Sequence, residues 1–197
     1  MVYAYAGLGS NLGDRENNIK EAIGLIKEKC RILKISSLYE TAPVGYKNQG
    51  YFLNCALKIK TDLKARELLE FFVFIEKKLG RIKVCVSKPR KSADFLLSAD
   101  FPLRIKNGPR IIDLDILFYG NGIINEKGLT IPHPRLHERL FVLQPLKEIS
   151  KNFVHPILKK SILELHKLKS GMKNPSVKLY KKNIDYYLFY SIGTILY

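Results

Sequence analysis

The chain has only three cysteines, and none of them stands in a C-x-x-C pair. Cys30, Cys55 and Cys85 are odd in number and widely spaced, a pattern that argues against a disulfide framework or a zinc site and is typical of a reducing compartment. We therefore expect buried thiols in a cytoplasmic protein.

Long apolar runs are also missing. No stretch reaches the roughly 18 residues that cross a bilayer, so we expect no membrane partner. The N-terminal sequence has no basic segment before its apolar residues, which favours a first strand over a signal peptide. No internal repeat or linker divides the 197 residues, whose 46% hydrophobic and 26% charged content suits one folded domain.

Acidic residues are few: 18 Asp and Glu stand against 34 Lys and Arg, a net charge of +16. Such a basic chain is able to bind a polyanion, but its lysines are scattered along the whole sequence. Charge by itself therefore decides little. We expect no specific nucleic-acid partner, and a monomer is favoured over an oligomer.

Hydrophobic patterning predicts an α+β fold. Strands are expected over 2–8, 32–38, 52–61 and 111–119, with an extended piece over 123–131. Helices are expected over 15–29 and 62–79, capped by Asp14 and Asp62, with Gly80 ending the second, and further helices over 134–148 and 161–169. The order β-α-β-β-α-β is that of the ferredoxin-like class, an antiparallel sheet with helices on its faces.

The strongest local motif is a pair of acids in the strand 111–119. Asp113 and Asp115 stand two apart, so both carboxylates point to one face, about 6.5–7 Å apart at the backbone. Mg²⁺ binds one or two protein carboxylates and completes its shell with water and substrate phosphate, and two such ions clamp a phosphoryl transfer. Arg110 adds a fork suited to phosphate. The pattern predicts a magnesium and phosphate site; the alternative is an exposed strand face with incidental acids.

A second polar cluster spans residues 132–141. His133 and His137 stand four apart, but no cysteine or H-E-x-x-H pattern completes a zinc site. Donors aimed at polyphosphate suit His133 and Arg139 better. We expect Arg135 and His137 on a solvated helix face.

Several motifs between about residues 3 and 149 together resemble the hydroxymethyldihydropterin pyrophosphokinase family. Each motif is weak to moderate alone, and their shared order makes the resemblance specific. They are Gly9-Ser10-Asn11-Leu12-Gly13-Asp14, Ser36-Ser37-Leu38-Tyr39-Glu40-Thr41-Ala42-Pro43-Val44-Gly45, Phe52-Leu53-Asn54, Ile75-Glu76 with Gly80-Arg81, Gly108-Pro109-Arg110 with Asp113-Leu114-Asp115, and Ile131-Pro132-His133-Pro134 with Arg139 and Phe141.

The resemblance implies a ferredoxin-like fold and transfer of pyrophosphate from ATP to 6-hydroxymethyl-7,8-dihydropterin, which gives AMP and the pterin diphosphate in tetrahydrofolate biosynthesis. It implies that Asp113 and Asp115 hold two Mg²⁺ ions, and that the pterin is stacked between Phe52 and Phe141 and hydrogen-bonded by Asn54. The implied catalytic residues are Arg81, Lys83, Arg110, Asp113 and Asp115. The implied ATP contacts are Glu76, Arg110, Ile116, His133 and Arg139. The implied pterin pocket is Thr41, Pro43, Val44, Phe52, Asn54 and Phe141.

The sequence departs from the family pattern in several places. Phe52 stands where tyrosine is common, Lys83 where arginine is expected, and Asn107 where an aromatic often precedes Gly-Pro-Arg. An apparent insertion over 84–104 lengthens the loop between Arg81 and Arg110; we expect this loop to close over ATP, with a passive insertion as the alternative. We place the pyrophosphokinase domain at 1–170 and a C-terminal extension of unknown role at 171–197.

Two other functions stay open at this point. Polymerase-β-type nucleotidyltransferases join a Gly-Ser turn to an Asp-x-Asp strand, which Gly9-Ser10 and the acid pair imitate, although about a hundred residues separate them here instead of one helix. A basic ferredoxin-like RNA-binding module would show K/R-G-F-G-F-type signatures, which the sequence lacks, and would leave the acid pair without a role.

Overall fold

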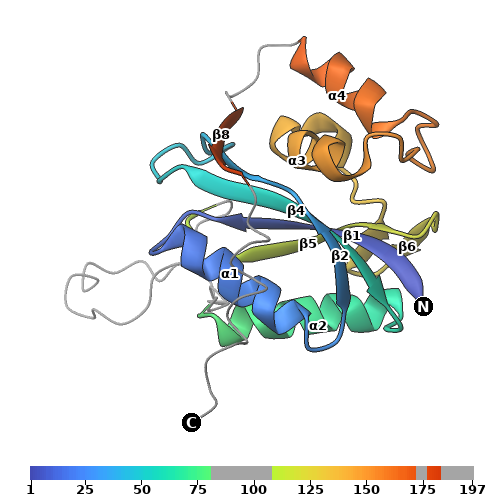
Figure 1. Cartoon of the computed structure of the whole chain (residues 1–197), viewed down its shortest axis with the longest axis horizontal. Coiled ribbons are helices and arrows are strands. Elements are labelled where there is room, and N and C mark those ends of the chain that lie inside the picture. Colours follow the sequence, from blue (N-terminus) through green and yellow to red (C-terminus); the bar gives the residue numbers. More distant parts are fainter. Residues whose placement is uncertain (81–107, 172–176, 183–197) are drawn as a thin grey trace, which may run out of the picture.

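An antiparallel sheet of six strands runs through the protein (Figure 1). The computed structural model describes residues 1–80, 108–171 and 177–182. Five strands follow one another in the order β5-β1-β4-β3-β8, and β2 pairs with β4 off this path. Their bounds are β1 Val2–Ser10, β2 Arg31–Ile35, β3 Leu38–Thr41, β4 Phe52–Thr61, β5 Asp113–Tyr119 and β8 Val177–Lys181.

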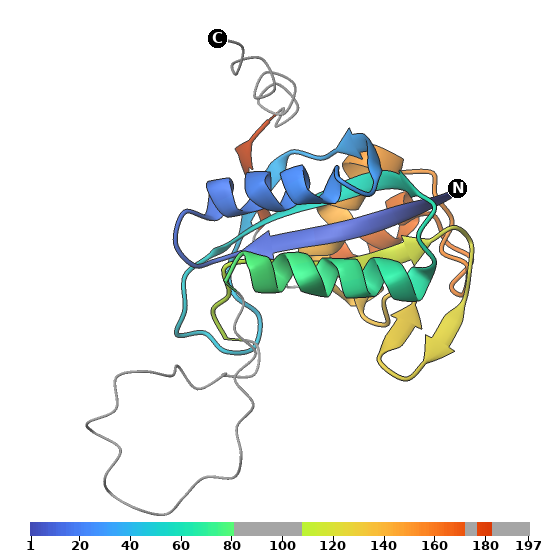
Figure 2. The ribbon, with the colours of Figure 1, turned by 90° about the horizontal axis from the view of Figure 1, so that it is seen from below.

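Helices cover both faces of this sheet (Figures 1 and 2). α1 (Arg15–Ile26) and α2 (Ala65–Lys78) lie on one face, and α3 (Leu140–Ser150) and α4 (Ile162–Ser170) on the other. The alternation of β4 explains the two layers: one set of its side chains joins the α1–α2 core, namely Leu53, Cys55, Leu57 and Ile59. Ala56, which points the other way, joins the α3–α4 core with Tyr5 and Phe118.

The element order confirms the predicted α+β, ferredoxin-like arrangement. β1 lies between β4 and β5, and every pair in the sheet is antiparallel. The strand predicted over 52–61 is β4, with the same bounds.

The single strand expected over 32–38 is wrong, because the chain breaks into β2 and β3. Ser36 Oγ accepts a hydrogen bond from the Ala56 backbone N–H at 2.9 Å. The backbone N–H and hydroxyl of Ser37 both donate to the Glu148 carboxylate, each at 2.9 Å. These bonds replace a continuous ladder, and they hold the start of β3 against α3.

Other boundaries also differ from the prediction. The cap assigned to Asp62 is wrong: α2 begins at Ala65, where the Lys64 backbone N–H donates to Glu67 at 2.8 Å, and Asp62 instead pairs with the N-terminal amine at 2.9 Å. The extended piece is a hairpin of β6 (Ile124–Glu126) and β7 (Leu129–Ile131). The helix expected over 134–148 is a 3-10 turn, Leu136–Glu138, followed by α3.

Two of the cysteines lie within the described residues, and both are buried and free. Burial raises the pKa of the Cys55 thiol to about 12, so this thiol stays protonated at neutral pH. Cys85 lies outside the described residues. No described helix has the length and apolar character that a membrane span needs.

A buried histidine after α3 gives the fold an expected pH dependence. His155 is 3% exposed, and its Nδ1 accepts hydrogen bonds from the backbone N–H groups of Ile157 and Leu158, both at 3.2 Å. Its ring lies edge-on to Phe118 at 5.4 Å and 6.4 Å from the ring of His137. Burial first, and then His137, lowers the pKa of His155, so the folded protein holds this imidazole neutral.

We expect this histidine to destabilise the protein in acid. The unfolded chain takes up a proton near the ordinary pKa of about 6.5, so the contribution is fully present above that pH and is lost as the pH falls below it. In His155→Asn, an amide oxygen replaces the accepting nitrogen and cannot titrate. Melting temperatures between pH 7 and pH 5 should therefore fall less steeply in the variant, and parallel curves would contradict the assignment.

Candidate active site

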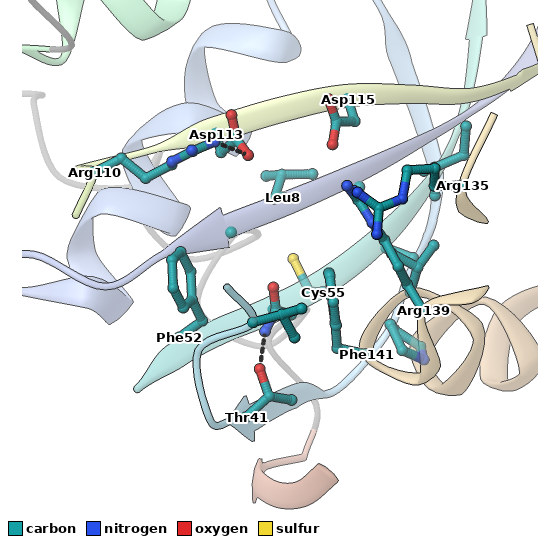
Figure 3. Close-up of a pocket in the computed structure, with 18 of the residues that line it drawn as sticks. Leu8, Thr41, Phe52, Cys55, Arg110, Asp113, Asp115, Arg135, Arg139 and Phe141 are labelled. Carbon is teal, nitrogen blue, oxygen red and sulfur yellow. Dashed lines mark hydrogen bonds and ion pairs between the residues drawn. The ribbon is translucent and has the colours of Figure 1, made fainter. Parts of the chain in front are cut away.

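A cavity of about 250 Å³ opens on the α3 side of the sheet (Figure 3). Residues of β1, β4 and β5, the segment that follows β3, and the start of α3 line it. Gly7 and Gly9 on β1 line the cavity and have no side chains that would fill it. A Cβ on Gly9 would lie 3.1 Å from Asn54 Oδ1, so glycine leaves room for that amide.

The two acids of β5 both border this cavity. Asp113 and Asp115 line it, while Leu114 between them points into the α1–α2 core. Arg110 Nη1 donates to Asp113 Oδ2 at 2.6 Å, and Figure 3 shows Asp115 farther along the strand. Both carboxylates therefore lie on one face of β5, as predicted. The guanidinium of Arg110 pairs with the carboxylate of Asp113.

A reciprocal bond fixes the loop that carries Arg110. The Arg110 backbone N–H donates to Asn11 Oδ1 at 2.8 Å, and the Asn11 backbone N–H donates to the Arg110 carbonyl at 3.1 Å. The Asn11 amide also donates to Gln49 Oε1 at 2.9 Å. Asn11 therefore joins the end of β1 to the start of β5 and to the loop before β4.

Glu76 on α2 binds the backbone of β5 between the two acids. This α2 residue is 3% exposed, and its carboxylate accepts the Leu114 backbone N–H at 2.8 Å. Among the strands of the described residues, β5 is the last on its side of the sheet, and this N–H finds its partner outside the ladder. Glu76 supplies it, and in doing so holds the backbone between Asp113 and Asp115.

Two basic residues, His133 and Arg139, lie near Asp115. His133 Nε2 lies 4.0 Å from Asp115 Oδ2, while its Nδ1 accepts the Arg135 backbone N–H at 3.2 Å. Burial, followed by the charge of Arg139, lowers the pKa of His133 to about 4, so the ring is neutral at neutral pH. Arg139 Cζ lies 5.7 Å from the centre of the Phe141 ring, a cation–π distance.

The opposite side of the cavity is aromatic and amide. The Asn54 Nδ2 group donates to Thr41 Oγ1 at 2.8 Å, and these residues are 7% and 3% exposed. Phe52 on β4 and Phe141 at the start of α3 both line the cavity, together with Asn54 and Thr41. Two rings and a fixed amide suit a flat heteroaromatic ligand.

A comparison with protein families shows the family of the chain. The model of the family described as 7,8-dihydro-6-hydroxymethylpterin-pyrophosphokinase (HPPK) matches residues 5–151. The chain belongs to the HPPK family.

Curated relatives are similar in sequence to most of this chain. The 2-amino-4-hydroxy-6-hydroxymethyldihydropteridine pyrophosphokinase of Bacillus subtilis is 43% identical over 148 residues, which cover 74% of this chain and 77% of the relative. That of Aquifex aeolicus is 42% identical over 164 residues, covering 83% and 90%. A folic acid synthesis protein of Dictyostelium discoideum is 40% identical over 154 residues, covering 78% of this chain but only 20% of its own length. The chain therefore spans about a fifth of some relatives.

Solved structures support the fold. A Plasmodium falciparum HPPK-DHPS triple mutant with pteroate superposes with a TM-score of 0.64 at 18% identity, covering 87% of this chain and 44% of that one. At this level of identity the likeness shows the shared fold.

The cavity gathers most of the residues that the resemblance to the HPPK family assigned. Four assigned residues, Pro43, Glu76, Ile116 and His133, do not line it. Ile116 is 5% exposed, and its side chain belongs to the α1–α2 core. Arg81, Lys83 and the insertion over 84–104 lie outside the described residues. Those that do line it are Thr41, Val44, Phe52, Asn54, Arg110, Asp113, Asp115, Arg139 and Phe141.

Sequence reasoning missed other residues of the HPPK cavity. Arg135, expected on a solvated face, is largely exposed and also lines the cavity, with its Nε 3.0 Å from Glu138 Oε2. No local pattern indicated this, because Arg135 and Arg139 flank the 3-10 turn Leu136–Glu138 and do not share an α-helix. Cys55 also lines the cavity, and no sequence signal distinguished it from a core thiol.

Proposed function

We propose that this cavity binds 6-hydroxymethyl-7,8-dihydropterin between Phe52 and Phe141, beside ATP phosphates held over Asp113 and Asp115. The observation that carries the proposal is the joining of two unlike half-sites in one cavity. One half is aromatic and amide, and the other holds two carboxylates with Arg110 and Arg139. A transfer between a pterin and a nucleotide needs both.

The pterin half-site recognises the flat ring of the pterin by stacking and its polar edge by hydrogen bonding. Offset stacking between two rings contributes about 0.5–1.5 kcal/mol beyond burial. Because Thr41 accepts from the Asn54 amide nitrogen, the Asn54 oxygen is oriented and remains able to accept from a pterin N–H.

The residues of the phosphate half-site fit two Mg²⁺ ions. Within the described ranges, no group of three or more His, Cys, Asp and Glu gathers around one point, and Asp113 and Asp115 are the described side chains that would hold the ions. That is the donor set Mg²⁺ takes when water and phosphate complete its shell. Bound there, Mg²⁺ would neutralise phosphate charge. Arg110 and Arg139 add fixed donors to the same charge.

The chain's own contribution to the reaction is positioning. The hydroxymethyl oxygen of the pterin attacks the β-phosphorus of ATP, the bond from that phosphorus to the α–β bridging oxygen breaks, and AMP leaves. The hydroxyl proton passes to solvent, since we assign no protein base. Aligned substrates and preorganised charge account for most of the acceleration in such transfers.

Several further assignments belong to this proposal. Arg81 and Lys83 act on the phosphates, Ile116 contacts ATP through its backbone, and His133 and Glu76 serve the nucleotide side, His133 as a neutral donor and Glu76 through β5. The catalytic domain spans 1–170, and the protein acts as a cytoplasmic monomer without a nucleic-acid or membrane partner.

One assay tests the activity. Purified protein, ATP, Mg²⁺ and hydroxymethyldihydropterin should yield AMP and pterin diphosphate in equal amounts. A nucleotidyltransferase would release pyrophosphate instead, and an RNA-binding module would release neither product. Absence of AMP in the presence of both substrates would refute the proposal.

The pterin half-site carries its own prediction. Asn54→Ala should raise the KM for pterin about tenfold or more, because a buried hydrogen bond to a ligand is worth about 1–3 kcal/mol, while the KM for ATP stays within about twofold. Asn17→Ala, on the exposed surface of α1, serves as the control and should leave both constants unchanged. Equal rises in the KM for pterin and the KM for ATP would show that the pterin pocket lies elsewhere.

A further inference from the structure

The edge strand β8 lies against the strand that carries Thr41 (Figure 1). β8 pairs antiparallel with β3, with Val177 opposite Thr41 and Lys178 opposite Glu40. On its other side, β3 pairs with β4 over a short register: Tyr39 with Asn54, Glu40 with Leu53, and Thr41 with Phe52. β3 is thus a four-residue strand that pairs with β4 on one side and with β8 on the other.

An ion pair fastens β8 to the first turn of α1. Lys181 Nζ lies 2.7 Å from Glu16 Oε1, and Lys20 Nζ lies 2.7 Å from the same oxygen. Hydrogen bonds from Lys181 and then Lys20 lower the pKa of Glu16, so the carboxylate stays charged at neutral pH. The end of β8 is therefore anchored to an element that does not belong to the sheet.

The same turn of α1 holds both strands that border the pterin half-site. Arg15 Nη1 lies 2.9 Å from Glu40 Oε1 on β3 and donates to the Tyr51 carbonyl, directly before Phe52, at 2.8 Å. Its Cζ lies 6.0 Å from the centre of the Tyr180 ring on β8. Arg15 therefore contacts β8, β3 and the start of β4.

We propose that β8 is a positioning strand for the pterin half-site, and this rests on the proposed function. Thr41 accepts from the Asn54 amide at 2.8 Å, so the orientation of Asn54 depends on where β3 lies. A β3 paired on one side only, through three residues, would move more freely. The fraction of molecules with Asn54 correctly oriented would fall, and the apparent pterin affinity would fall in proportion. The carboxylates of β5 lie at the far end of the strand order from β8 and should not be affected.

A double proline variant tests the strand directly. In Lys178→Pro with Leu179→Pro, one of the two removed N–H groups necessarily faced β3, because successive donors of a strand point to opposite edges. We expect the pterin KM, and the pterin Kd measured with a non-hydrolysable ATP analogue, to rise about tenfold, as they would if about a tenth of the molecules were competent. The ATP KM and kcat should stay within about twofold.

A matched control keeps the backbone donors. Lys178→Ser with Leu179→Ser removes the same exposed side chains and should behave as the unmodified protein. An unchanged pterin KM in the proline variant, equal rises for both substrates, or the same rise in the serine variant would each overturn the proposal. Failure of the proposed function can be told apart from failure of this proposal, because the unmodified protein would then release no AMP.

A second pair of variants covers the case in which the proline chain does not fold. Lys181→Gln removes the ion pair between β8 and α1, and Lys20→Gln removes the other cation from Glu16 while leaving that ion pair in place. We expect a rise in pterin KM, smaller than tenfold, in Lys181→Gln only. Equal behaviour of the two variants would overturn the role of the anchor and with it the proposal.

Discussion

Replacing Asp113 or Asp115 with asparagine should lower kcat about a thousandfold, because each change removes a carboxylate that we propose to hold Mg²⁺, and a metal ion at a phosphoryl oxygen is worth several kcal/mol. The fold should survive. The Arg110–Asp113 pair is partly exposed, with side chains 21% and 24% accessible, and pairs of this kind contribute about 1 kcal/mol or less. Steady-state kinetics at saturating Mg²⁺ and a thermal melt measure both quantities.

Asp62→Asn is the matched control for these variants. Asp62 pairs with the N-terminal amine, its side chain is 69% exposed, and it does not line the cavity. It should leave kcat unchanged. A folded Asp113 or Asp115 variant with near-normal turnover would remove the carboxylates from the mechanism.

Replacing Arg139 with alanine should lower kcat/KM about a hundredfold, the usual loss for one preorganised donor to developing charge. Arg139 is half-buried and packs over Phe141, so the variant also loses support for the pterin ring, and the pterin KM should rise. Arg139→Lys keeps the charge but not the planar fork, and should recover only part of the loss.

The exposed pair of Arg66 with Glu126 offers the control. Arg66→Ala removes an arginine of similar charge from α2, outside the cavity, and should change neither constant. If Arg139→Ala proved as active as Arg66→Ala, the charged half-site would have to be built from other residues.

Local sequence pattern accounted for much of the site. The period of two in a strand placed Asp113 and Asp115 on one face, and it placed Asn54 opposite the apolar side chains of β4. These inferences succeed because the backbone geometry of a strand fixes the direction of neighbouring side chains wherever the strand lies in the fold.

Boundaries were less predictable, because they depend on distant partners. The expected strand over 32–38 breaks where Ser37 meets Glu148 of α3, and no local pattern contains that contact. The start of α2 differs because Glu67 accepts the Lys64 backbone N–H, while Asp62 pairs with the N-terminal amine. At Ser37, tertiary hydrogen bonds outweighed a local propensity worth about 1 kcal/mol.

The sequence by itself determined the element order, the acid pair and, through its ordered motifs, the family. The tertiary structure decided which of the marked residues meet: Phe141 comes from a helix on the opposite face from α1 and α2, yet it lies beside β4, and Glu76 reaches the acid pair only through the Leu114 backbone. It also brought β8 to the edge of β3. Such meetings depend on strand register and layer packing, which join segments far apart in the chain and leave no period in the sequence around either partner.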